Sequence, residues 1–177
     1  MKDPKESCFG DPSRFAILTR QDSPGDATGF FCLSAGGRKV GDFERRTTYV
    51  IQVGFFERAL PVHAAPWPGG FEQIADPVAS FEFLKKLAFG DADPRVGYDS
   101  PFHRMVLTNN LGEPFDGFFA ILRPAPGGEI WLVDDQDGRP SVARFGAAAY
   151  FEAARKFIEA QAPGSAPGEP RRGSRRT

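Results

Sequence analysis

The sequence predicts an α+β fold, in which an antiparallel meander sheet carries two or three helices on one face of a single domain. Short segments of strand composition are separated by turns of hairpin length, which favours antiparallel pairing. Two longer segments show helical periodicity. The chain has 177 residues, of which 25% are charged and 13% aromatic. This composition is typical of a globular domain that is long enough to bury a substantial core.

The first third of the chain is predicted to hold three strands, at residues 14–20, 28–34 and 40–43. A Gly-Asp-Pro corner precedes the first of them. Pro12 fixes its own φ, and the Asp11 side chain can accept a hydrogen bond from a backbone amide one or two residues further on. A stiff turn is therefore expected in front of the first strand.

The segment at residues 47–60 fits two patterns. Its alternating apolar residues and β-branched content indicate a strand, whereas its length and its Glu-Arg-Ala-Leu ending indicate a helix, which we prefer. Residues 61–75 are rich in Pro, Gly and aromatic side chains and are predicted to form a loop. A helix is then predicted between Asp76 as N-cap and Gly90, with Pro77 in its first turn.

The last part of the chain is predicted to be a meander followed by one helix and a tail. Residues 91–101 are predicted to be a loop, and the closing helix spans 147–161. The globular domain is expected to comprise 1–161, and the Arg-rich segment 162–177 is expected to be disordered. The four predicted strands of the meander are 102–108, 117–123, 129–134 and 141–145.

Charge and cysteine content exclude several classes of protein. The formal net charge is −1, but residues 162–177 hold four Arg and one Glu, so residues 1–161 carry −4. An acidic body argues against nucleic-acid binding and suits a basic protein partner. Two cysteines are too few for a disulfide framework. Neither a signal peptide nor a membrane-spanning run is recognised, so we expect a cytoplasmic protein without membrane association.

Few residues suit catalysis or metal binding, and no cofactor is expected. His63 and His103 are 40 positions apart without an HxxxH or HExxH pattern, and Cys8 and Cys32 lack the CxxC spacing of a zinc site. The turn DDQDG fails as a calcium loop, because residues without ligand oxygens fall at its first and last positions. We therefore expect no catalytic or metal site, although a small hydrolase-type enzyme pairing one Cys with one His stays an alternative.

The segment at residues 113–137 is the most acidic part of the domain, with six carboxylates against one Arg, a local net charge of −5. Neighbouring hairpins are expected to present these carboxylates together with two aromatic residues. Such a face can dock a basic protein, with the charges setting specificity and the aromatic residues contributing binding energy. An ordinary solvated rim is the other interpretation. The residues predicted to contact a partner are Glu113, Phe115, Asp116, Trp131, Asp134, Asp135 and Asp137.

The stretch GDPSRFAI, at residues 10–17, resembles the start of the immunity protein 42 family of bacterial polymorphic toxin systems, in which a Gly-Asp-Pro corner leads into a Phe-Ala-Ile-like strand. The later order of a WLVDD strand, a return strand and a closing helix is similar to the layout of that family. The resemblance implies a non-enzymatic protein that binds one cognate secreted toxin and neutralises it. It also implies that the Gly-Asp-Pro corner serves the scaffold, by fixing the register of the first strand. A secretion adaptor or chaperone is a further alternative, and its expected sign is an exposed apolar groove. The oligomeric state is left open.

Overall fold

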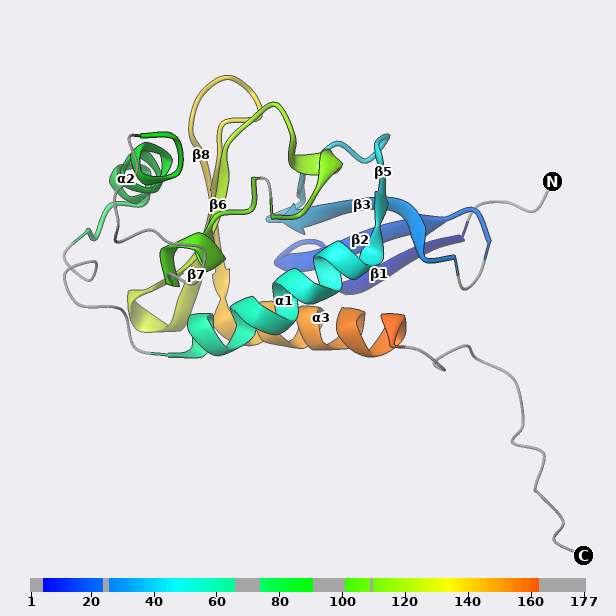
Figure 1. Cartoon of the computed structure of the whole chain (residues 1–177). Helices are drawn as coiled ribbons and strands as arrows, with labels where there is room; N and C mark the ends of the chain where they lie inside the picture. Colours follow the sequence, from blue (N-terminus) through cyan, green and yellow to red (C-terminus); the bar gives the residue numbers. More distant parts are fainter. Residues whose placement is uncertain (1–4, 24–25, 66–73, 91–100, 109, 163–177) are drawn as a thin grey trace, which may run out of the picture.

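The computed structural model describes residues 5–23, 26–65, 74–90, 101–108 and 110–162. Over these residues the chain forms two antiparallel sheets and three α-helices, which confirms the α+β class (Figure 1). The predicted loop at 91–101 and the predicted tail at 162–177 lie almost entirely outside the described residues.

The first sheet has five strands in the order β1-β2-β3-β4, and β5 also pairs with β3. Strand β3 pairs with β5 through its first residues and with β4 through its last. The predicted strand at 40–43 is wrong beyond Val40, because β4 ends there and Gly41 turns the chain with a φ of 107°. The strands are β1 (Lys5–Asp11), β2 (Phe15–Gln21), β3 (Thr28–Ala35), β4 (Arg38–Val40) and β5 (Arg46–Thr48).

The Gly-Asp-Pro corner is the turn of a hairpin, because strand β1 precedes it, a strand that the sequence did not predict. The Asp11 carboxylate accepts hydrogen bonds from the Ser13 amide at 2.9 Å and the Ser13 hydroxyl at 2.7 Å. The carbonyl of Pro12 accepts a hydrogen bond from the Gly37 amide at 2.9 Å. The corner thus joins the β1–β2 hairpin to the β3–β4 turn and has the scaffold role that was predicted for it.

The second sheet has three strands in the order β6-β7-β8, which are the last three of the four strands predicted for the meander. The strand predicted at 117–123 begins only at Ala120. Its strands are β6 (Ala120–Ala125), β7 (Glu129–Asp134) and β8 (Ser141–Gly146), with the short 3-10 turn η4 (Pro126–Gly128) between β6 and β7.

The predicted strand at 102–108 is wrong. The chain forms the 3-10 turn η2 (Pro101–Met105) there, and only Val106 makes an isolated bridge, to Ile121. The Val106 amide bonds back to the His103 carbonyl, which bends the segment away from an extended course.

The three α-helices are α1 (Tyr49–Ala64), α2 (Pro77–Phe89) and α3 (Ala147–Gln161). Helices α2 and α3 lie where the sequence predicts them, and the Asp76 carboxylate accepts a hydrogen bond from the Ala79 amide at 2.7 Å as an N-cap. The ambiguous segment at 47–60 is helical from Tyr49 onward. The predicted loop from residue 61 is wrong as far as Ala64, because α1 continues through Pro61, whose ring lies on the exposed side of the helix.

Helices α1 and α3 lie side by side on one face of the five-stranded sheet, whereas α2 lies beyond the smaller sheet (Figure 1). The smaller sheet is therefore covered on both faces. Along β7, Ile130 and Leu132 enter the large core that α1 and α3 cover, and Trp131 and Val133 enter a second core under α2. Two helices, α1 and α3, therefore pack on one face of the larger sheet as expected, and the third helix, α2, packs on the other face of the smaller sheet.

Candidate functional site: an acidic surface around η3

The segment at residues 112–118, here called the η3 segment, carries two exposed carboxylates that flank a buried aromatic residue. It contains the 3-10 turn η3 (Glu113–Phe115), and Phe115 is fully buried in the large core. A Cβ atom at Gly41 would lie 3.1 Å from the Phe115 ring, so the backbone at Gly41 packs closely against this ring. Because the Phe115 side chain is held in the core, the exposed residues Glu113 and Asp116 on either side of it have a defined position.

Two hollows lie on either side of the η3 segment, and Asp116, Gly117 and Phe118 line both. The first, here called the loop hollow, has a volume of about 520 Å³ and reaches the loop at residues 41–44. The second, here called the helix hollow, has a volume of about 600 Å³ and reaches Phe89 at the C-terminal end of α2. Both are open to solvent, which suits contact with another protein more than enclosure of a small molecule.

Two of the predicted contact residues, Asp134 and Asp135, are ion-paired within the chain. Asp134 is fully buried at the end of β7, and both of its oxygens accept from the Arg38 guanidinium, one of them at 3.0 Å. Asp135 binds the Lys85 ammonium at 2.6 Å and accepts the Phe119 amide at 2.6 Å. These carboxylates connect the end of β7 to β4, to α2 and to the start of β6.

Three other predicted contact residues, Glu113, Asp116 and Asp137, are exposed. Their carboxylates form no ion pair with any residue of the described part of the chain. Asp137 lies between Gln136, which lines the loop hollow, and Gly138, which lines the helix hollow. Asp116 and Asp137 are thus at these two hollows, whereas Glu113 lines a third hollow that Arg46 also lines. Carboxylates without an ion-pair partner can attract a basic protein, and Lys39 is the cation that lines the loop hollow beside them.

The two aromatic residues predicted to contact a partner are buried. Phe115 is 0% exposed and Trp131 is 5% exposed. The Trp131 ring lies between the guanidinium groups of Arg123 and Arg144, at 4.9 and 5.3 Å from its centroid. Trp131 faces α2 because β7 is the central strand of a sheet that is covered on both faces. With Asp134, these residues are not available on the surface.

Sequence reasoning missed the residues that form the outer walls of the hollows. Asp42 and Glu44 line the loop hollow, and Phe89 and Phe118 line the helix hollow. The sequence did indicate that residues 41–44 form an exposed acidic loop, since two carboxylates follow a glycine that favours a turn. The exposure of Phe89 could also have been expected, since the last residue of an amphipathic helix, just before the terminating Gly, need not belong to the buried stripe.

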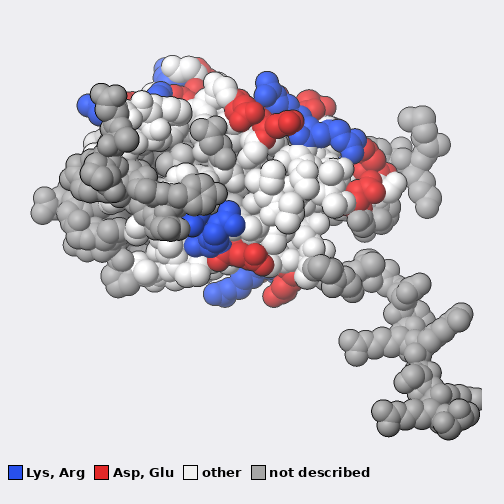
Figure 2. Space-filling view, viewed as in Figure 1, with Lys and Arg blue, Asp and Glu red and all other residues white. Residues whose placement is uncertain are grey.

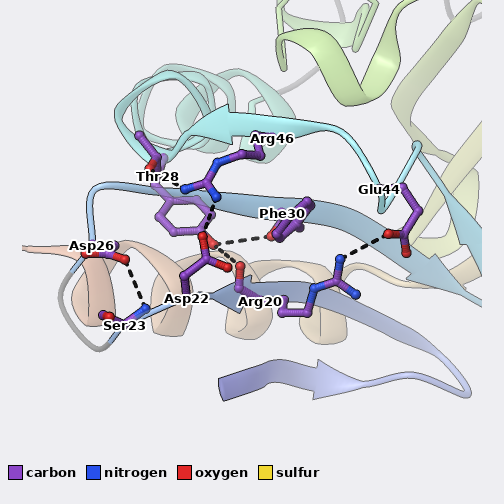
Figure 3. Close-up of polar contacts among 9 residues, drawn as sticks. Arg20, Asp22, Ser23, Asp26, Thr28, Phe30, Glu44 and Arg46 are labelled. Carbon is purple, nitrogen blue, oxygen red and sulfur yellow. Dashed lines mark hydrogen bonds and ion pairs between the residues drawn. The ribbon is translucent and has the colours of Figure 1, made fainter. Parts of the chain in front are cut away.

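Beyond the loop hollow, charged side chains are neutralised in pairs (Figure 3). Arg20 extends toward Glu44, at 3.2 Å, and its guanidinium lies 4.1 Å from the centre of the Phe30 ring. Arg46 extends toward Asp22 and donates to the Thr28 hydroxyl at 3.2 Å. Exposed pairs of this kind contribute little to stability, but they remove unbalanced charge from this region of the surface.

Figure 2 shows how charge is distributed on this face of the molecule. Acidic and basic side chains alternate in a band over the η3 segment and β5, and an uncharged area lies below them over the first turns of α1. Val50 and Ile51, on those turns, are 69% and 43% exposed. This face therefore offers both a charged band and an exposed apolar area.

Neither thiol of the Cys–His alternative has the environment of a reactive nucleophile. Burial raises the pKa of the Cys32 thiol to about 12, and partial burial, with Asp11 nearby, also raises the pKa of the Cys8 thiol. A reactive thiol needs the opposite shift. The ring nitrogens of His63 lie 2.8 Å from the Tyr150 hydroxyl and 3.2 Å from the Arg104 carbonyl. Burial lowers the pKa of His63 to about 4, and this His is a structural residue of the core.

The described residues hold neither a metal-binding cluster nor a membrane-spanning helix. No group of three or more His, Cys, Asp or Glu side chains in the described ranges could hold a metal ion. None of the helices described here is both long enough and apolar enough to cross a bilayer.

Comparison with known proteins identifies a family whose model matches most of the chain. The family model for immunity protein 42 matches residues 6–139, which include the Gly-Asp-Pro corner, the η3 segment and all three unpaired carboxylates. Strand β8 and helix α3 follow the matched region. Searches of curated proteins and of solved structures find no match.

Proposed function

This chain belongs to the immunity protein 42 family, and we propose that it binds one cognate secreted bacterial toxin and neutralises it by covering a surface that the toxin needs. The single observation that supports a docking role for the η3 region is that Asp116 and Asp137, at two open hollows, are exposed and form no ion pair with the described residues. Carboxylates without an internal cation are solvated and are available to a basic partner.

The proposed contact surface differs in its aromatic members from the one that the sequence predicts. It keeps the three unpaired carboxylates and adds Phe89 and Phe118 in place of the buried Phe115 and Trp131. Phe89 is 60% exposed, so its ring can be desolvated on binding. The acidic residues would accelerate association and select the partner, and the aromatic residues would supply most of the affinity.

The proposed action is inhibition by binding and requires no bond-making step. The raised pKa values of both thiols and the core position of His63 support this, since these groups are kept in their neutral forms. The producing cell's cytoplasm is the proposed place of action, because a toxin neutralised there cannot harm the cell that makes it.

Co-expression with the product of the adjacent reading frame tests the function. We expect that product to be toxic alone, harmless with this chain, and co-purified with it. The double reversal Asp116→Lys/Asp137→Lys should abolish protection. The matched double reversal Glu6→Lys/Glu57→Lys changes the net charge equally at exposed positions elsewhere and should protect like the natural chain. A neighbour that is neither toxic nor bound would contradict the proposal.

A secretion adaptor is the second candidate, favoured by the exposed side chains of Val50 and Ile51. An adaptor would bind an apolar segment of its client through α1. In the same co-purification, Val50→Ser/Ile51→Ser would then release the client, and the double charge reversal at Asp116 and Asp137 would not.

A further inference from the structure

We propose that the helix hollow receives an arginine side chain of the bound protein, with its guanidinium between the Asp116 carboxylate and the Phe89 ring. This inference rests on the proposed function and names the chemistry that the docking surface recognises. The hollow lies between the η3 segment and the C-terminal end of α2 and is lined by residues of both.

The aromatic wall of the hollow is unusually exposed. Phe89 is the last residue of α2 and is 60% exposed, with its ring centroid 5.4 Å from that of Phe119 in an edge arrangement. Phe118, half-buried on the η3 segment, lines the same hollow. Rings with one open face attract cations through their negative π surface, and they also pack on the aliphatic part of an Arg side chain.

The charge at the hollow favours a cation. Lys85 and Asp135 neutralise each other at 2.6 Å, so the local charge is set by Asp116, which has no ion-pair partner among the described residues. The C-terminal end of α2, where Phe89 lies, adds the negative end of the helix dipole. A guanidinium satisfies a carboxylate and a ring at the same time, because it is planar and donates in its plane.

The chain already uses this arrangement for its own cations. The Arg20 guanidinium lies 4.1 Å from the Phe30 ring centre and 3.2 Å from the Glu44 carboxylate. The Lys85 ammonium lies 5.4 Å from the Phe81 ring centre and is bound to Asp135. In the helix hollow, a ring and a carboxylate occur together, but no cation of the described residues lies over Phe89.

A titration of the full chain with the peptide N-acetyl-Gly-Arg-Gly-amide, followed by amide NMR shifts, tests the site directly. We expect saturable shifts at the residues that line the helix hollow, and weaker binding of the citrulline peptide, which has the shape of arginine without its charge. Phe89→Ala and Asp116→Asn should each raise the dissociation constant about fivefold, because each removes one of the two attractions. Both side chains are exposed, so the variants should fold.

Val50→Ala is the matched control, because it trims another exposed apolar side chain outside the hollow, and it should leave the titration unchanged. Absence of saturable shifts at the hollow, or equal binding of the arginine and citrulline peptides, would overturn the inference. The proposed function would survive that result if the adjacent gene product still co-purified. Conversely, arginine binding at the hollow without any bound gene product would support the site and contradict the function.

Discussion

The acidic residues of this molecule fall into two groups that differ in what their carboxylates contact. Asp134 and Asp135, at the end of β7, hold the cations of Arg38 and Lys85. Asp137, in the turn that follows, and Glu113 and Asp116, on the η3 segment, form no ion pair with the described residues, and Asp137 acts on Arg38 only as a nearby charge that helps to raise its pKa. Negative charge therefore has two uses here. The paired group joins elements of the fold, and the unpaired group is available for binding.

The difference has a clear consequence for stability. The Asp134–Arg38 pair connects the two sheets, because Asp134 ends β7 and Arg38 begins β4. A second bond across the same junction runs from the Gly41 amide to the Gln136 side chain, at 2.9 Å. The unpaired carboxylates have no corresponding role, so substitutions in the two groups should affect different measurements.

The largest expected effect is that of Asp134→Asn. The substitution leaves the Arg38 guanidinium, which is only 30% exposed, without its counter-charge at a buried junction. Removing one partner of a buried pair should lower the free energy of unfolding by about 3 kcal/mol, measured by urea denaturation.

The double variant Asp134→Leu/Arg38→Leu serves as the control for that prediction. Because it removes both charges and leaves neither unpaired, it should be more stable than Asp134→Asn alone. An Asp134→Asn variant as stable as the natural chain would show that the pair does not hold the sheets together.

The next effect is a pH dependence that arises from a buried group with only neutral partners. His63 accepts from the Tyr150 hydroxyl and donates to the Arg104 carbonyl, and burial lowers its pKa to about 4. Between pH 6.5 and 4 the unfolded state binds more protons than the folded state. The stabilisation is therefore complete above pH 6.5 and is lost as the pH falls toward 4. We expect a loss of about 2 kcal/mol between pH 7 and pH 5 from this residue.

Urea denaturation of His63→Gln at both pH values isolates that contribution. The glutamine does not titrate, so the difference in stability between pH 7 and pH 5 should be smaller by that amount than in the natural chain. Equal differences in the two proteins would mean that His63 is protonated without cost in the folded state.

Local signals in the sequence were sufficient for much of the fold. Asp76, Pro77 and Gly90 mark the ends of α2 through capping chemistry, and β7 and α3 follow from patterns within single segments. Strand β1 was missed because its polar residues and single Phe give no alternation, and it is defined by pairing with β2. The strand predicted at 102–108 was wrong for the opposite reason. Its apolar residues suggest a strand, but the segment forms no ladder with a neighbouring strand.

The site could be predicted in part. The acidic character of residues 113–137 is visible in the sequence, but the separation of Asp134 from Asp137 is not. Asp134 is paired because Arg38, 96 positions earlier in the chain, is brought to it by the packing of the two sheets. The continuous apolar run of β7 did contain the information that Trp131 is buried, because a strand covered on both faces lacks alternation.

The smallest expected effect on stability is that of neutralising the three carboxylates without an ion-pair partner. In the triple variant Glu113→Gln/Asp116→Asn/Asp137→Asn, the side chains keep their shape and lose their charge. Since none of the three carboxylates holds a cation of the described residues, the free energy of unfolding should change by less than about 0.5 kcal/mol. The association rate with the adjacent gene product should nevertheless fall about tenfold at low ionic strength, and added salt should slow the variant less than the natural chain. Stopped-flow measurements at several salt concentrations give both quantities. A variant that lost stability but associated at the natural rate would place these carboxylates with Asp134 and Asp135, as part of the scaffold.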